Sequence, residues 1–188
     1  QEFLECVADK PISYYAFEML YWTGIREGKL LALTPSDFNF EKKTLRINKS
    51  YQRLEGEDVI TDPKTPKSNR TIVMLDFLII EMEDFIKSIY GIKIDDRIFT
   101  ISKNYLHHEM DRGAKLAGVK RIRIHGLRHS HISLLINLGF SALAIGERVG
   151  HEAVDITYHY VHLFPTVQTD MAAQLETERE ALVNVRKE

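Results

Sequence analysis

The 188-residue sequence has a single cysteine, Cys6, and a single tryptophan. One cysteine cannot form an internal disulfide, and without a second thiol it offers no zinc knuckle. No apolar run reaches the roughly 18 residues of a membrane span, and no basic-then-apolar leader is present. Because the first residue is Gln rather than Met, we expect a fragment excised from a cytosolic protein.

The motifs of several enzyme classes are also missing. The segment HEAVD at 151–155 lacks the second histidine of an H-E-x-x-H helix, and His107 and His108 are adjacent rather than spaced to converge on one ion. There is no glycine-rich phosphate loop and no G-x-S-x-G elbow. The sequence therefore disfavours metal catalysis and gives no sign of P-loop or serine-hydrolase chemistry.

Hydrophobic residues make up 44% of the sequence, which is enough to form the core of one globular domain. Its net charge of −2 hides an uneven distribution. The stretch 112–131 carries six Lys or Arg and no carboxylate, whereas 76–85 and 174–182 are acidic. Such a basic run is either a surface for the phosphates of a nucleic acid or an ordinary solvated face.

The predicted fold class is α+β and mostly α-helical. Apolar spacing predicts a helix over 13–23 that stops at Gly24 and a short helix within 26–38 that Pro35 ends. Segments rich in β-branched residues predict a small three-stranded antiparallel sheet at one edge of the domain, over 42–52, 57–62 and 69–75. Further helices, most ending at glycine, are predicted over 76–91, 101–118, 125–139, 141–150, 153–164 and, in a polar tail, 169–185.

Two basic residues at the start of one predicted helix suggest an anion site. His125 and Arg128 are three apart, so their side chains lie on the same side of the helix. Cations at a helix N-terminus oppose the macrodipole unless an anion binds there. The alternative is a solvated polar helix end. Arg26, in a loop, and Lys64, in a turn, are each ordinary surface residues when taken singly.

Two tyrosines near the end of the chain differ in direction. Tyr158 and Tyr160 are two apart, which on a helix separates them by roughly 200°. They cannot share a face, so one is expected to face a site while the other packs or faces solvent. His151 follows a glycine, nine residues before Tyr160.

Four motifs in order resemble the catalytic domain of the tyrosine recombinases, the integrase family of phages and conjugative transposons. They are TGIREGKLLAL at 23–33, PKTPKSNRTIVM at 63–74, HGLRHSHISLL at 125–135 and VGHEAVDITYHYVHL at 149–163. The resemblance implies a mostly helical catalytic domain with a small sheet, and DNA strand cleavage without a metal or other cofactor. Its site residues fall on Arg26, Lys64, His125, Arg128, His151 and Tyr160, with Lys67 the alternative to Lys64.

The roles that the resemblance implies suit these residue types. Arg26 and Arg128 would clamp the scissile phosphate and stabilise its transition state, because a guanidinium presents a planar fork of donors. Tyr160 would attack phosphorus, and Tyr158 would pack. His125 would assist proton removal from Tyr160, His151 would donate a hydrogen bond to the phosphate, and Lys64 would protonate the departing 5′ oxygen. The product is a 3′-phosphotyrosyl linkage, which a 5′ hydroxyl can reverse without ATP.

The sequence departs from the family pattern at Lys29, where an acidic residue is usual three positions after the first arginine. The resemblance also implies N-terminal DNA-binding domains, which we expect to lie outside this fragment. We expect residues 1–165 to form the catalytic domain and 166–188 a tail helix that docks on a neighbouring protomer.

The resemblance also implies partners: double-stranded DNA at attachment sites, a synaptic tetramer of this protein and an accessory directionality factor, acting in the bacterial cytoplasm and without a membrane. Two other interpretations remain. One is an inactive DNA-binding regulator on the same scaffold, which the presence of all the expected residue types disfavours. The other is a type IB topoisomerase, which plasmid relaxation without site preference would support.

Overall fold

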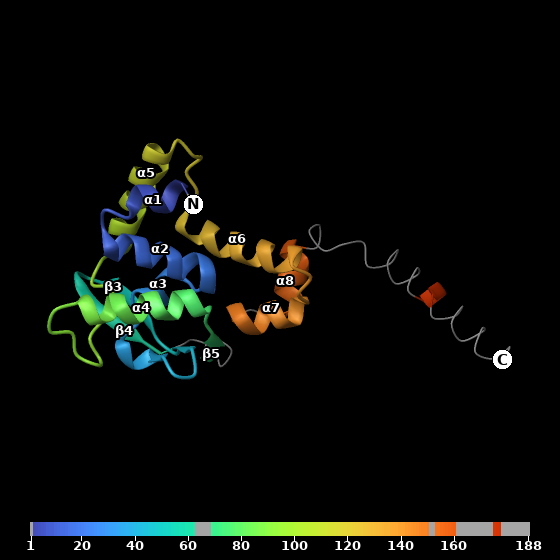
Figure 1. Ribbon diagram of the computed structural model, residues 1–188, viewed down its shortest axis with the longest axis horizontal. Coiled ribbons are helices and arrows are strands. Elements are labelled where there is room, and N and C mark those ends of the chain that lie inside the picture. The colour runs from blue at the N-terminus through green and yellow to red at the C-terminus, as the bar shows by residue number, and fades with distance from the viewer. Residues whose placement is uncertain (1, 63–68, 151–152, 161–174, 178–188) are drawn as a thin grey trace.

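The computed structural model describes residues 2–62, 69–150, 153–160 and 175–177, except for the side chains of 153, 154 and 157. Helices dominate, and the strands lie at one edge of the molecule (Figure 1), which confirms the predicted fold class. Within these residues, no helix is both long and apolar enough to cross a membrane.

The N-terminal part is helical, with α1 (Glu2–Val7), α2 (Pro11–Thr23), α3 (Glu27–Leu30) and the 3₁₀ helix η1 (Pro35–Asp37). Pro11 stands in the first turn of α2, where its missing N–H costs nothing, and Gly24 ends the helix in the left-handed region at φ 62°. The predicted stop at Gly24 is confirmed. α1 was not predicted, because six residues are too few to display a clear apolar period.

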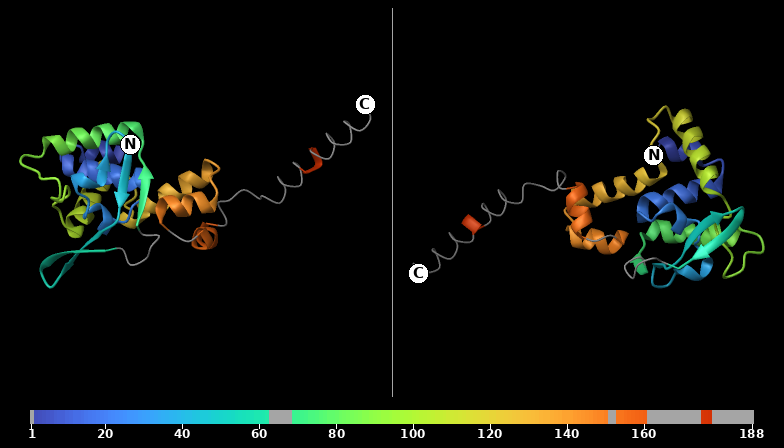
Figure 2. Two further views of the ribbon diagram at one scale, coloured as in Figure 1. Left: turned by 90° about the horizontal axis from the view of Figure 1, so that it is seen from below. Right: turned by 180° about the vertical axis from the view of Figure 1, so that it is seen from behind.

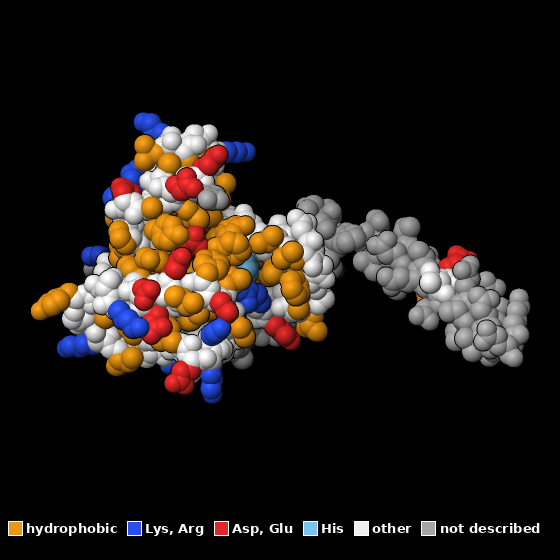
Figure 3. Space-filling model, in the orientation of Figure 1, with side chains coloured by type: hydrophobic (Ala, Val, Ile, Leu, Met, Phe, Trp, Pro, Cys, Tyr) orange, Lys and Arg blue, Asp and Glu red, His pale blue; other side chains and the backbone are white. Residues whose placement is uncertain are grey.

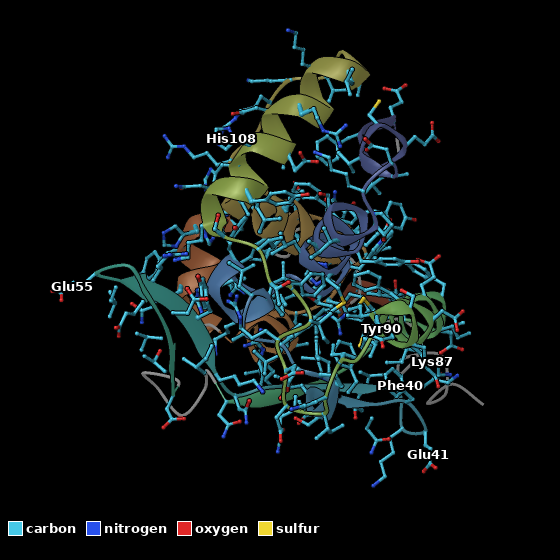
Figure 4. The ribbon with its side chains drawn as sticks, turned by 90° about the vertical axis from the view of Figure 1, so that its left-hand side faces the viewer. Phe40, Glu41, Glu55, Lys87, Tyr90 and His108 are labelled. Atoms are coloured by element: carbon cyan, nitrogen blue, oxygen red, sulfur yellow. The ribbon has the colours of Figure 1, made fainter. Side chains whose placement is uncertain are left out.

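The strands form a sheet and a separate hairpin. β1 (Phe38–Asn39), β2 (Thr44–Ile47) and β5 (Arg70–Val73) form a three-stranded antiparallel sheet in the order β1-β2-β5. β3 (Ser50–Leu54) and β4 (Glu57–Thr61) pair with each other in a hairpin that projects from the body in the left view of Figure 2. The turn of this hairpin contains Glu55, at the left edge of Figure 4.

The three-stranded sheet was therefore predicted, but with the wrong strands. Segment 42–52 divides into β2 and β3, and 57–62 belongs to the hairpin rather than to the sheet. The pairing follows burial. Leu45 and its register partner Ile72 are both buried, whereas the tip of the hairpin is exposed and has no apolar face to bury on the sheet.

The elements that follow β5 in the described chain are all helices, as predicted: α4 (Asp76–Ser88), α5 (Lys103–Ala117), α6 (Ile124–Asn137), α7 (Ala142–Val149) and α8 (Ala153–Tyr160). Gly118 and Gly150 end α5 and α7 in the left-handed region. The predicted tail helix over 169–185 lies outside the described residues apart from 175–177, which are helical.

Two hydrophobic clusters underlie this arrangement. The larger cluster contains residues from helices α1 through α5, from the sheet and from the start of α6. Its buried residues include Phe17, Leu30 and Phe99. The smaller joins the C-terminal half of α6 to α7 and α8, and its buried members are Ile132, Ile136, Ile145, Val149, Ile156 and Tyr160. α6 therefore belongs to both clusters, and α7 and α8 lie at its far end (Figure 1).

Candidate active site

Arg128 lies on the buried side of α6 and is 2% exposed. Its Nη1 donates a hydrogen bond of 2.5 Å to the carbonyl oxygen of Gly24, and its Nη2 donates one of 2.6 Å to that of Val149. These carbonyls stand at the C-terminal ends of α2 and α7, where backbone acceptors lack partners within the helix. The ends of two helices therefore orient the guanidinium, while its Nε is buried without a hydrogen-bond partner among the described residues.

Three further cations gather around Arg128. Arg26 is half-buried at the N-cap of α3, two residues after the left-handed turn at Gly24. Lys29, one turn later, is only 5% exposed. Arg70 begins β5, where its Nε donates a hydrogen bond of 2.7 Å to the carbonyl oxygen of Arg148. We call Arg26, Lys29, Arg70 and Arg128 the cationic cluster.

The pKa values of the cluster show how unfavourable its charge is. Burial first, and then Arg26 and Arg70, lower the pKa of Arg128 to about 9. Burial and the neighbouring arginines lower the pKa of Lys29 to about 8, and burial with Arg26 and Arg148 lowers that of Arg70 to about 10. No carboxylate of the described chain is among the groups that shift these pKa values. An anion entering the site would relieve this mutual repulsion.

The nearest acidic side chain in sequence does not neutralise the cluster. Glu27 directly follows Arg26, yet its carboxylate lies 3.6 Å from His107 on α5. Burial raises the pKa of Glu27, and the groups that lower it are His107 and Lys103. Glu27 is thus directed toward His107 and does not take the place of the acidic residue that the resemblance led us to expect at position 29, where a buried Lys29 stands instead.

Tyr160, the last residue of α8, packs in the smaller cluster and is 8% exposed. Its hydroxyl is hydrogen-bonded to Nδ1 of His129 on α6. Burial raises the pKa of Tyr160, while the positive charge of Arg128 acts in the opposite direction. The phenol is thus protonated at neutral pH and lies within the field of the cationic cluster.

His125 lies one turn before His129 on α6. It is exposed, unlike Arg128, although both were predicted to lie on the same side of the helix. Its ring packs edge-on against that of His129, with the centroids 4.7 Å apart. Burial, then His129, Arg128 and Arg26, lower the pKa of His125. His125 therefore lies in the same field as the cluster, but the histidine bonded to Tyr160 is His129.

Tyr158 does not pack, contrary to the prediction. Its side chain is 79% exposed, whereas that of Tyr160 is buried. The two tyrosines do face different directions, as the helical period requires. Position 160 points toward α6 and α7, so position 158 is left on the solvent side of α8.

Two of the predicted site residues, Lys64 and His151, lie outside the described residues, as does Lys67. Among the described ones, the structure brings Arg26 and Arg128 together with Lys29 and Arg70, and places Tyr160 within reach of the charge of Arg128. In the part of the chain that is described, no group of three or more His, Cys, Asp or Glu side chains could hold a metal ion.

Sequence reasoning missed Arg70 and His129. Arg70 had a weak signal, a basic residue at the start of a predicted strand just after the lysine-containing segment 63–68. His129 had a clearer one, because it follows His125 by four residues and so lies on the same helix face. Arg148 was also missed. It donates hydrogen bonds to Nε2 of His131 and to the carbonyl oxygens of Val73 and Trp22.

The basic run at 112–131 does not form a uniformly basic surface. Arg112 pairs with Asp9 and Glu109, at 2.7 and 2.8 Å, and Arg121 pairs with Asp111 at 2.6 Å. Arg128 is buried in the site described above. Two of the six basic residues in this stretch are thus paired with carboxylates, and a third is buried.

The fold and site thus combine a mostly helical α+β domain with a buried cationic cluster and a buried tyrosine. Residues 2–166 match the family model described as the phage integrase family, and the chain belongs to that family. The chain is 30% identical to the ICEBs1 integrase of Bacillus subtilis, over 94% of this chain and 53% of that protein.

Solved structures share the fold. The Tn1549 transposon integrase, in complex with circular intermediate DNA, aligns with a TM-score of 0.74 at 23% identity, over 94% of this chain and 63% of that one. The catalytic domain of bacteriophage HP1 integrase aligns with a TM-score of 0.61 at 20% identity, over 91% and 88%. The chain spans about half the length of the curated relatives it matches.

Proposed function

We propose that this chain is the catalytic domain, over residues 1–165, of a site-specific DNA recombinase that integrates and excises a mobile element through a covalent 3′-phosphotyrosyl intermediate. The observation that carries the proposal is the cationic cluster. No described carboxylate is among the groups that shift the pKa values of its three arginines, and the charge of Arg128 opposes the rise in the pKa of the buried Tyr160 hydroxyl. Relatives named as integrases, one of them solved with DNA, support it. The substrate would be double-stranded DNA at the attachment sites.

The cluster would bind the scissile phosphate. Arg26 and Arg128 would donate hydrogen bonds to its non-bridging oxygens and stabilise the charge of the pentavalent transition state. Nη1 and Nη2 of Arg70 are also buried without hydrogen-bond partners among the described residues. Since unpaired buried donors are costly, an oxygen-rich anion is the ligand that fits them.

Tyr160 would attack the phosphorus and displace the 5′ oxygen. A phenol is a weak nucleophile until its proton leaves, and the field of Arg128 lowers the cost of that loss. Lys64 would protonate the departing oxygen, and His151 would donate a hydrogen bond to the phosphate. Because one phosphate ester replaces another of similar energy, a 5′ hydroxyl can reverse the step without ATP or a metal.

The decisive experiment is to trap the adduct. The chain would be incubated with a pool of nicked duplexes of randomised sequence, in which the cleaved end diffuses away, and adducts would be separated on denaturing gels. We expect an adduct with the wild type and with Tyr158→Phe, and none with Tyr160→Phe. Peptide mapping should place the nucleotide on Tyr160.

An adduct that survives in Tyr160→Phe would refute the assignment of Tyr160 as the nucleophile. A wild-type chain that binds duplex without forming an adduct would favour the inactive DNA-binding regulator. Relaxation of plasmids without site preference would favour a topoisomerase.

The role of Lys64 can be tested with a 5′-bridging phosphorothiolate, whose thiolate leaves without a proton because thiols are much stronger acids than alcohols. If Lys64 is the general acid, Lys64→Ala should cleave the ordinary duplex slowly and the sulfur-containing duplex at the wild-type rate. Lys67→Ala is the matched control, three residues further along the chain, and should cleave both normally. The opposite pattern would move the role to Lys67.

The tail and the assembly complete the proposal. We propose that residues 166–188 dock on a neighbouring protomer in a synaptic tetramer, assisted by a directionality factor, in the bacterial cytoplasm. Hydrophobic side chains gather across the middle of the face in Figure 3, and a groove on the described surface is lined by Trp22, Leu75, Leu135 and Phe140. Such a face favours a protein partner. Cross-links found only within single chains of a DNA-bound assembly would rule out the exchange.

A further inference from the structure

The hydroxyl of Tyr160 contacts a histidine that the sequence reasoning did not assign. Nδ1 of His129 is its hydrogen-bond partner, and the two rings lie with their centroids 5.8 Å apart. His129 follows Arg128 on α6, so one turn of this helix carries both the buried guanidinium and the ring bonded to the phenol. His125 reaches this pair only through the edge-on packing of its ring against that of His129.

The protonation states fix the direction of the hydrogen bond. Burial, then Arg128 and His159, lower the pKa of His129, so its ring is neutral at pH 7. Burial raises the pKa of Tyr160, so its oxygen carries a proton. A neutral imidazole has one acceptor and one donor nitrogen. The phenol therefore donates to Nδ1, and the ring proton of His129 is on Nε2.

We propose that His129 is the base that accepts the phenolic proton of Tyr160 during strand cleavage, a role that rests on the function proposed above. The O–H bond of Tyr160 breaks and an N–H bond forms at Nδ1. The phenolate oxygen bonds to phosphorus, the bond from phosphorus to the 5′ oxygen breaks, and that oxygen takes a proton from the general acid. Since the ring is exposed, His129 can then release its extra proton to water.

The charges around His129 suit a base that holds the proton only briefly. The titratable groups that face it among the described residues are His125 and Arg128 on its own helix and Tyr160 and His159 on α8. None is a carboxylate, so no described group would retain the imidazolium after the transfer. A bound phosphate would supply a transient negative charge and make the transfer easier.

His125 is left with a different task. Of the groups that lower its pKa, Arg128 and Arg26 belong to the cationic cluster. It therefore lies in the field of the cluster and against the ring of His129, where it can position that ring or donate to the phosphate. In either case it is not the first acceptor of the proton of Tyr160.

The test compares His129→Gln and His129→Ala with the wild type in the adduct assay, between about pH 5 and pH 8. The wild-type rate should fall toward low pH as His129 becomes protonated. His129→Gln keeps an acceptor for the hydroxyl but cannot take the proton, so adduct formation should be about 10²-fold slower and lose this acid limb. Added imidazole should partly restore His129→Ala. The control is His108→Gln, whose side chain projects from α5 (Figure 4) and which should match the wild type.

A second measurement does not depend on activity. The ¹⁵N chemical shifts of the His129 ring report its tautomer, and the proposal requires the Nε2–H form with an Nδ1 shift that changes in Tyr160→Phe. An Nδ1–H ring in the wild type would overturn the proposal, as would His129→Gln with the wild-type rate and pH profile. A wild-type chain that forms no adduct, with the expected tautomer in place, would instead overturn the proposed function.

Discussion

Two guanidinium groups of the cationic cluster, those of Arg128 and Arg70, are held by neutral acceptors rather than by carboxylates. Arg128 is bonded to two backbone carbonyls and Arg70 to a third. A carbonyl orients a guanidinium without cancelling its charge, whereas a carboxylate would do both. The positive charge is thus preserved for an incoming anion, at a cost that appears as the lowered pKa values of the cluster.

The first prediction concerns Arg70. Its two Nη atoms are buried and unpartnered in the described structure, so we expect them to bind the phosphate with Arg26 and Arg128. Arg70→Lys keeps a charge but loses the fork, and should slow adduct formation by about 10²-fold, the usual effect of removing one charge-stabilising donor. Arg46→Lys is the matched control, because Arg46 is on the neighbouring strand and is 53% exposed. Equal rates for the two variants would exclude Arg70 from the site.

The second prediction concerns the stability cost of Lys29. Burial lowers its pKa from 10.5 to about 8, so between these values the unfolded chain binds a proton that the folded chain does not. Stability therefore rises with pH through this window, and the full penalty is present at neutral pH. Lys29→Met should raise the free energy of unfolding at about pH 7 by up to about 3 kcal/mol, and by much less near pH 10, as measured by urea denaturation.

Lys49→Met provides the contrast for this measurement. The ammonium of Lys49 lies 2.8 Å from a carboxylate oxygen of Asp37, whose side chain is fully buried. Removing that partner leaves a buried carboxylate with less compensation, so Lys49→Met should lower stability. If both variants lost stability equally at neutral pH, the charge of Lys29 would not destabilise the folded state.

At the scale of elements, the ends of helices build the site. Gly24 ends α2 at φ 62°, and its carbonyl oxygen accepts a hydrogen bond from Arg128. A Cβ added at Gly24 would lie 2.5 Å from Cδ2 of His131. The turn that ends α2 therefore does three things: it stops the helix, it holds Arg128, and it leaves room for α6 to approach closely.

The third prediction separates backbone strain from this close approach. Gly118 ends α5 at φ 66° and has nothing within 4 Å of an added Cβ. Gly118→Ala should cost about 1–2 kcal/mol, the strain of a left-handed residue with a side chain. Gly24→Ala should cost more in thermal or urea denaturation, since the buried ring of His131 must also move. It should slow adduct formation if the strained turn displaces the carbonyl oxygen that holds Arg128. Equal losses of stability would show that the approach to His131 is unimportant.

The sequence predicted the elements better than their contacts. The helix over 13–23 and the stop at Gly24 followed from apolar period and from the left-handed preference of glycine, both of which are local. The strand pairing failed because 42–52 reads as one β-branched segment, while its division depends on which part finds a buried partner in Ile72. His129 was missed because its bond to Tyr160 joins positions 31 residues apart.

At the scale of the whole molecule, two arginines connect two cores. The smaller cluster contains Tyr160, and the larger contains the start of the chain and the sheet. Arg128 joins the ends of α2 and α7, and Arg148 joins α7 to the carbonyl oxygens of Trp22 and Val73. The position of Tyr160, the proposed nucleophile, relative to Arg26 and Arg70 thus depends on these polar bonds as well as on α6, which belongs to both clusters.

The last prediction tests this dependence through Arg148, which donates hydrogen bonds to the carbonyl oxygens of Trp22 and Val73 across the boundary and a third to Nε2 of His131 on α6. Arg148→Met should leave those acceptors unpaired and free α7 and α8 to open locally. Hydrogen exchange should then quicken by about 10²-fold in α7 and α8, which corresponds to roughly 3 kcal/mol of local stability, while exchange in α2 and α4 should change little. Glu147→Gln, an exposed substitution on the same helix, is the control. If α7 and α8 open locally, only these helices should lose protection from exchange. A uniform rise in exchange across all helices would instead mean that the two clusters unfold as one unit.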